Sequence, residues 1–146
     1  MPTGTPRPLS LLRAGGWLAK PKVYDGYRYR STAEANYAAR LDLLVDSGKI
    51  LDWRRATFYR IEVNGIYCGR YTPDFVIVYL DGSEELIEVK GWAARDFLFR
   101  YNVFRASRPD LKITVVDGDG QPYDPNQRRR GSDAAVRKLV REGRAR

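Results

Sequence analysis

The sequence contains no histidine and a single cysteine, Cys68. Without histidine there is no serine–histidine or cysteine–histidine nucleophile and no zinc site that needs imidazole, and one cysteine cannot replace those ligands. A lone cysteine also cannot close an internal disulfide, which favours a cytoplasmic location. Any metal bound by this chain must therefore have oxygen ligands.

Long hydrophobic runs are also missing. The longest apolar run, from Phe75 to Leu80, is far too short to span a membrane, and the first twenty residues hold three prolines, three glycines and no signal-like apolar segment. We therefore expect a soluble protein with no membrane partner. The 146 residues, of which 43% are hydrophobic, are enough for one globular core.

Positive charge is in excess and lies at the two ends of the chain. The net charge is +8, of which residues 1–30 contribute +5 and residues 128–146 contribute +6, so the middle carries −3. Basic extensions on an acidic body favour a nucleic-acid partner, although solvation alone is the other interpretation. We divide the chain into a Pro/Gly-rich basic arm (1–27), a core (28–127) and a basic tail (128–146).

Helix and turn signals outline the first half of the core. Ser31-Thr32-Ala33-Glu34 has the pattern of a capping box and predicts a helix that ends at Ser47-Gly48. Asn64-Gly65 predicts a tight hairpin turn between strands at 57–63 and 66–70.

The second half of the core alternates strands and a helix. Phe75–Leu80 and Glu85–Lys90 read as a pair of strands, Ala93–Ser107 as an amphipathic helix, and Leu111–Val116 as a strand parallel to its predecessor. The predicted fold is α/β, with a mixed sheet and the core order α-β-β-β-α-β.

Two carboxylates fall at the ends of neighbouring strands. Side chains alternate along a strand, so Glu88 and Lys90 share one face while Val89 points to the other. Asp74 joins that face if it lies opposite Glu88, which requires an odd-numbered loop around Asp81-Gly82 or a bulge. A two-residue turn would place Asp74 opposite Val89 instead and put Glu88 on the other face.

Paired carboxylates on one face make a hard oxygen site suited to Mg²⁺ or Mn²⁺, and Lys90 could stabilise charge developing on a phosphate. Glu34, on the apolar side of the first helix, is a further candidate, with helix capping as the equally good alternative. A Glu-x-Lys pattern alone usually lies on a solvated strand face, so the prediction depends on all four residues meeting.

Residues 28–116 resemble the PD-(D/E)XK nuclease superfamily. The resemblance is carried by Pro73-Asp74, Glu88-Val89-Lys90 and the Ser31-x-x-Glu34 helix start. It implies a restriction-endonuclease-like core and Mg²⁺-dependent cleavage of DNA that leaves a 5′-phosphate. By position it makes metal ligands of Glu34, Asp74, Glu88 and the Val89 carbonyl, and makes Lys90 the catalytic lysine.

Further similarity is to small phage-encoded and archaeal-type Holliday junction resolvases, through the Tyr29 to Glu34 opening, the Trp53 strand and the Tyr71-x-Pro73-Asp74 step. So short a chain has no room for a separate recognition domain, which favours recognition of DNA shape, such as a four-way junction. The alternatives are another endonuclease of this superfamily, acting in nicking, repair or packaging, and a non-catalytic nucleic-acid-binding module.

A junction resolvase makes two coordinated cuts, so we expect a homodimer. Candidate interface residues, for which core packing is the alternative, are Trp17, Trp53, Phe97 and Phe99. Candidate phosphate contacts are Arg28, Arg30, Arg128, Arg129 and Arg130.

Overall fold

The computed structural model of the chain describes residues 22–91 and 93–127. Arg128, Arg129 and Arg130 lie outside the described residues, as does Trp17. The elements, in chain order, are β1 (Val23–Tyr24), β2 (Tyr27–Arg28), α1 (Thr32–Asp46), β3 (Asp52–Arg55), β4 (Tyr59–Val63), β5 (Ile66–Tyr71), β6 (Phe75–Val78), β7 (Glu84–Val89), α2 (Arg95–Ser107) and β8 (Ile113–Val116).

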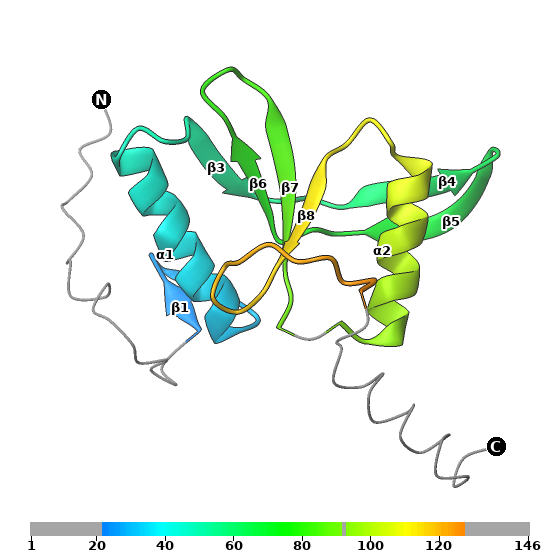
Figure 1. Cartoon of the computed structure of the whole chain (residues 1–146), viewed down its shortest axis with the longest axis horizontal. Coiled ribbons are helices and arrows are strands. Elements are labelled where there is room, and N and C mark those ends of the chain that lie inside the picture. Colours follow the sequence, from blue (N-terminus) through cyan, green and yellow to red (C-terminus); the bar gives the residue numbers. More distant parts are fainter. Residues whose placement is uncertain (1–21, 92, 128–146) are drawn as a thin grey trace, which may run out of the picture.

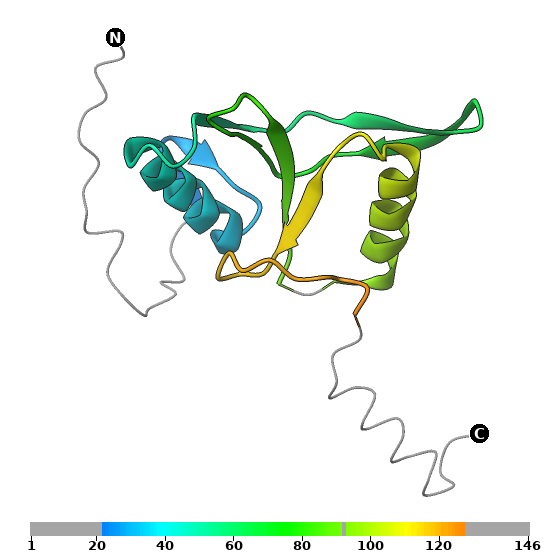
Figure 2. The same ribbon diagram turned by 45° about the horizontal axis from the view of Figure 1, so that its top comes forward.

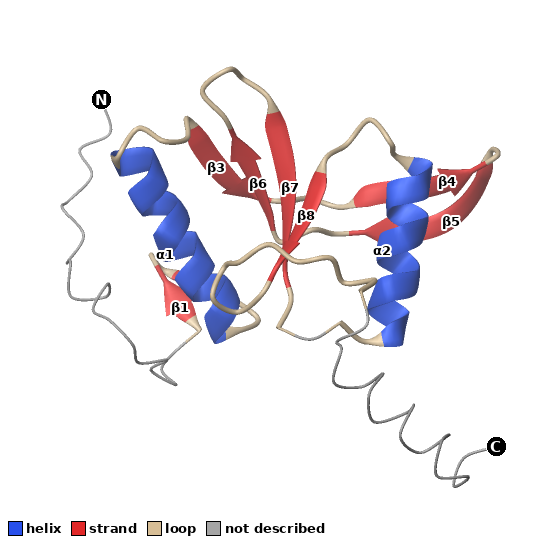
Figure 3. Cartoon of the chain, viewed as in Figure 1, coloured by secondary structure: helices blue, strands red, loops and turns tan. Residues whose placement is uncertain are grey.

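A four-stranded mixed sheet forms the centre of the fold, with α1 and α2 on its two sides (Figures 1 and 3). Its strand order is β3-β6-β7-β8, in which β7 and β8 are parallel and the other neighbours are antiparallel. Helix α2 is the crossover that parallel strands require. With the separate β4–β5 hairpin set aside, the elements run α1, β3, β6, β7, α2, β8, which is the predicted α-β-β-β-α-β order and confirms the mixed α/β fold class. The first strand of this core is β3, whereas the strands predicted at 57–63 and 66–70 lie outside the central sheet.

The hairpin predicted at Asn64-Gly65 is confirmed as strands β4 and β5. Both turn residues have positive φ angles, 51° and 78°, as a two-residue turn matching the strand twist requires. The two strands form a sheet of their own, however, rather than joining the central sheet. In Figure 2 they continue from β3 and β6 and run past α2 as a long ribbon.

A second, unpredicted hairpin, β1–β2, spans the expected boundary between arm and core at residue 27. Asp25 and Gly26 form its turn, also with positive φ angles, so the same turn signal as Asn64-Gly65 was present in the sequence. The Tyr24 hydroxyl donates a hydrogen bond to Asp42 of α1. The hairpin is thereby attached to the first helix.

Side-chain alternation along the strands divides the core into two clusters, one on each face of the sheet. Phe75, Ile77, Ile87 and Val89 face α1, whereas Val76, Leu86 and Val115 face α2. The helices contribute aliphatic residues on one side and aromatic rings on the other: Ala35, Ala38 and Leu41 from α1, and Phe97, Tyr101 and Phe104 from α2.

The packing settles the position of two proposed interface residues. Phe97 is buried in the α2 cluster and does not reach the surface. Trp53 is half-buried, packs its ring 5.6 Å from that of Phe75 and donates its indole N–H to Asp42. Both therefore serve the core, the alternative considered above. Among the three candidates that the structure describes, Phe99 is the exposed one, with 72% of its surface accessible.

Within the described ranges, neither helix combines the length and apolar character needed to cross a membrane.

Phe75 is the centre of the α1 cluster, since the rings of Tyr29, Tyr37 and Trp53 all lie within 6.0 Å of its ring. We expect Phe75→Ala to lower the free energy of unfolding by about 3–5 kcal/mol, because it leaves a cavity among these rings. Urea unfolding measures the change. Phe99→Ala, a matched truncation on the surface, should change stability by less than about 0.5 kcal/mol, and an equal loss in both variants would contradict the assigned packing.

Candidate functional site

The register between β6 and β7 brings the predicted carboxylates to one face. Phe75 pairs with Ile87 and Val78 with Glu84, so the intervening loop, Tyr79–Ser83, has five residues. This is the odd-numbered loop that the prediction required. Extended by one residue, the register places Asp74 opposite Glu88, on the face that carries Val76 and Leu86 and turns toward α2.

Glu88 is buried, with only 5% of its surface exposed, and it is held at both oxygens. The Tyr71 hydroxyl donates a hydrogen bond of 3.0 Å to Oε2. The Lys90 ammonium lies 3.5 Å from Oε1 and 5.0 Å from the centre of the Phe97 ring. Because 39% of the Lys90 side chain is exposed, its ammonium reaches both the carboxylate and solvent.

The β6–β7 ladder ends beside this pair. Its paired register begins at Phe75, and Pro73, two residues earlier, has no N–H with which to extend it. The Asp74 N–H donates to the Ile87 carbonyl at 2.9 Å, and the Val89 N–H donates to the Asp74 carboxylate at 2.8 Å. A side chain thus accepts the hydrogen bond of the Val89 N–H.

Burial and like charge dominate the electrostatics. Desolvation, followed by the neighbouring Glu88 charge, raises the pKa of Asp74 to about 7. Burial also raises the pKa of Glu88, against the opposing effects of Lys90 and the Tyr71 hydrogen bond. One buried and one half-buried carboxyl group therefore share a half-exposed lysine as their cation, which leaves the pair short of positive charge.

Glu34 has the capping role and lies near enough to affect the pair. Its backbone N–H donates to the Ser31 hydroxyl at 3.1 Å, and that hydroxyl donates to its carboxylate at 3.0 Å. The first half of the capping box, the hydrogen bond from the Glu34 N–H to the serine side chain, is confirmed. In the second half, the Glu34 carboxylate accepts its hydrogen bond from the Ser31 hydroxyl. Its negative charge nevertheless contributes to the raised pKa values of Asp74 and Glu88.

The oxygen chemistry of the site fits a divalent cation, although the side chains are not gathered into a complete ligand set. Across residues 22–91 and 93–127, no three carboxylate or cysteine side chains come together as a metal-binding group. Asp74, Glu88 and the Val89 carbonyl offer hard oxygen donors, and the shortage of positive charge favours a cation there. Glu34 would have to leave Ser31 to join them.

The predicted phosphate contacts that the structure describes, Arg28 and Arg30, are exposed. They flank buried Tyr29 just before the start of α1 and so lie close in the chain to Glu34.

Tyr71 is the residue of the site whose role the sequence did not reveal. Its ring stacks on Phe104 of α2, with centroids 4.6 Å apart, and this packing aims the hydroxyl at Glu88. The burial of Tyr71 next to two carboxylates raises its pKa strongly, so the hydroxyl stays protonated and can donate. The contact depends on α2, which is far away in the sequence.

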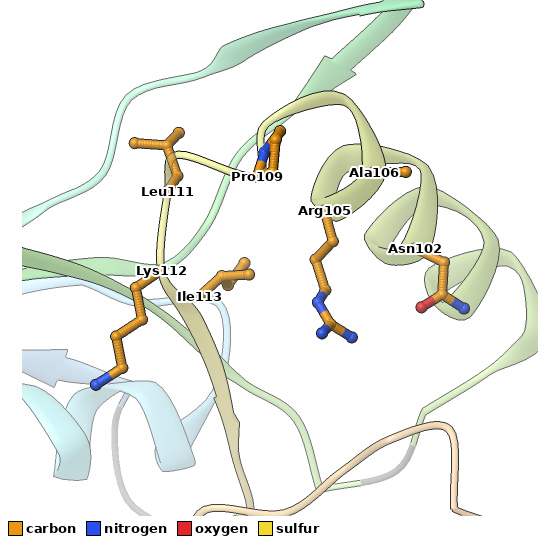
Figure 4. A pocket seen from close by; sticks show the side chains of 7 residues that line it. All are labelled: Asn102, Arg105, Ala106, Pro109, Leu111, Lys112 and Ile113. Atoms are coloured by element: carbon orange, nitrogen blue, oxygen red, sulfur yellow. The ribbon is translucent and has the colours of Figure 1, made fainter.

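The pocket in Figure 4 is separate from the carboxylate pair. It lies between α2 and the segment that leads into β8 and is lined by Asn102, Arg105, Ala106, Pro109, Leu111, Lys112 and Ile113. None of the predicted site residues lines it, so it adds nothing to the site.

The chain belongs to the family described as a protein of unknown function, DUF1064, which matches residues 16–118. The matched range includes both carboxylates, Lys90 and both helices, but the family description assigns no activity. No curated protein matches the chain. The site residues themselves therefore carry what can be inferred about function.

We expect the metal-free protein to lose stability as the pH rises from about 4 to about 8. The pKa of Asp74 is higher in the folded state, at about 7, than its ordinary value of 3.8, so folding favours the protonated form and is penalised once the group ionises. Asp74→Asn should remove a decrease on the order of 2 kcal/mol. Urea unfolding of both proteins in EDTA at pH 5 and pH 8 measures it; identical pH dependence would contradict the assignment.

Proposed function

We propose that this protein is a Mg²⁺- or Mn²⁺-dependent DNA endonuclease of the PD-(D/E)XK type that hydrolyses phosphodiester bonds. The observation that carries the proposal is the pair of half-buried Asp74 and buried Glu88 on one face of two adjacent strands, with Lys90 in contact with Glu88. Such a pair, with the pKa of Asp74 raised to about 7, is unfavourable in a purely structural role. It becomes favourable when a cation shares the oxygens.

Asp74, Glu88 and the Val89 carbonyl would hold the metal, with Glu34 as the further ligand that the resemblance suggests. A bound divalent cation supplies a water of lowered pKa and polarises the phosphate. The Lys90 ammonium lies beside Glu88 and can donate to a phosphate oxygen as negative charge develops there. Tyr71 fixes the Glu88 carboxylate through Oε2.

The proposed substrate is branched DNA, most specifically a four-way junction. The described residues form one small core with no appended recognition domain, which favours recognition of DNA shape over a long base sequence. Exposed Arg28 and Arg30 supply phosphate contacts beside α1. A homodimer would provide the two cuts that resolution needs.

The decisive experiment compares a labelled four-way junction, a linear duplex of the same sequence and a single strand, each with Mg²⁺, Mn²⁺ or EDTA. We expect metal-dependent, paired nicks at the junction, and a loss of at least about 10²-fold for Glu88→Gln and Asp74→Asn. Glu84→Gln is the matched control, because Glu84 lies on the same strand but is exposed and pairs with Arg54.

The outcomes separate the alternatives. Cleavage of every duplex selects another endonuclease of the same type over a junction resolvase. Binding without cleavage in any metal selects a non-catalytic module and contradicts the proposal, as does full activity of Glu88→Gln.

We expect Tyr71→Phe to slow cleavage by about 10-fold, because Oε2 of Glu88 loses its donor and the carboxylate is less well positioned for metal. The Mg²⁺ concentration that gives half-maximal rate should rise, which a purely structural role would not cause. Tyr101→Phe, which removes a hydroxyl from a buried ring of the same cluster, is the control. An unchanged metal requirement in Tyr71→Phe would show that the hydrogen bond has no role in the reaction.

A further inference from the structure

The β4–β5 hairpin has one face in the core and one face in solvent. Tyr59, Ile61 and Tyr71 pack against Phe104 of α2, so the residues that alternate with them point away from the helix. We call this solvent side the outer face and define it by Phe58, Arg60, Glu62, Tyr67 and Arg70, all of which are exposed.

Each arginine of the outer face lies over an aromatic ring. The Arg60 guanidinium is 4.5 Å from the centre of the Tyr67 ring, and the Arg70 guanidinium is 4.6 Å from that of Phe58. Stacking uses the flat side of a guanidinium and leaves its N–H edges free, while it limits the side chain's rotamers. These arginines are therefore held ready to donate hydrogen bonds into solvent.

The same arrangement continues onto the central sheet. Arg55 pairs with Phe75 at the end of β3 and places its guanidinium 3.6 Å from the centre of the Tyr27 ring. Since Phe75 belongs to the cluster that faces α1, Arg55 also lies on the side turned away from α2. Three stacked arginines thus follow one side of the ribbon that Figure 2 shows running from β3 to the hairpin tip.

The outer face carries more positive than negative charge, because its carboxylate, Glu62, stands beside two arginines and forms no ion pair among the described residues. Arg60 and Arg70 are direct cross-strand partners, and like charges in that position destabilise a hairpin. The ion pairs among the described residues use Arg54, Lys90, Arg108 and Lys112, and none involves Arg60 or Arg70. An anionic ligand would relieve this repulsion.

We propose that the outer face of the β4–β5 hairpin binds a duplex arm of the DNA substrate, with Arg60 and Arg70 donating to backbone phosphates. This inference rests on the proposed function for the identity of the polyanion. A two-stranded ribbon fits the width of a DNA major groove, and a five-residue strand spans roughly 17 Å. A symmetric contact between two copies of this face would instead bring four arginines against two glutamates, which leaves positive charge in excess.

The test is binding of a fluorescent four-way junction in EDTA, where cleavage cannot occur. We expect Arg60→Gln/Arg70→Gln to bind at least about 10-fold more weakly and to lower the magnitude of the salt slope, log Kd against log salt, by about 2. The control is Arg100→Gln/Arg105→Gln, which removes the same charge from exposed positions on α2, one of them also over a ring, that of Tyr101. Arg60→Lys/Arg70→Lys keeps the charge and should retain the salt slope.

Equal weakening in the two glutamine doubles, or none in the hairpin double, overturns the proposal. So does a change in oligomeric state, measured by sedimentation, with unchanged DNA binding, because the face would then contact a second copy of the chain. Thermal unfolding of each variant checks that it folds. Hairpin-dependent binding without cleavage by wild type in Mg²⁺ would support the inference and contradict the nuclease proposal, whereas cleavage without hairpin dependence would do the reverse.

Discussion

The five-residue loop between β6 and β7 is the constraint on which the candidate site depends. Because side chains alternate along strands, one residue more or less in that loop would send Glu88 and Lys90 to the α1 face and leave Asp74 on the α2 face. The two clusters of the core fix the same register, since Phe75 and Ile87 must face α1 while Val76 and Leu86 face α2. The same strand register therefore satisfies both core packing and the juxtaposition of the carboxylates.

Once the register has brought the two carboxylates together, the remaining question at the site is how their negative charges are balanced. Glu88 has a hydroxyl and an ammonium as partners, and Asp74 has one backbone N–H, which together do not offset burial of both groups as anions. A second buried carboxylate, Glu85, shows the contrast. It faces α1 with hydroxyl donors from Tyr79 and Thr114 and an ion pair to Lys112, and its pKa is lowered. The two buried carboxylates of the described residues thus differ: the partners of Glu85 lower its pKa, whereas burial outweighs the partners of Glu88 and raises its pKa.

Local signals explain what the sequence could predict. The Ser31 cap, the Asn64-Gly65 turn and the strand pattern around Asp74 and Glu88 act over a few residues, and each was found where expected. Contacts that depend on elements far apart in the chain were not predictable, because no local pattern encodes them. The Tyr71 hydrogen bond requires α2 to pack under β5, and the stacking of Arg55 on Tyr27 requires β1–β2 to fold back onto β3. The sequence alone did not decide whether Phe97 packs in the core or lies at an interface, and the packing of α2 on the sheet decides it.

Tyr71 belongs to both parts of the molecule, the protruding hairpin and the carboxylate pair. Its backbone pairs with Tyr59 at the base of the ribbon, its ring rests on Phe104, and its hydroxyl holds Glu88. Any tilt of the ribbon relative to α2 therefore has to move that hydroxyl. A displacement of the hairpin would therefore also displace the hydroxyl that holds Glu88, so the position of the hairpin and the orientation of the carboxylate are coupled through one aromatic ring.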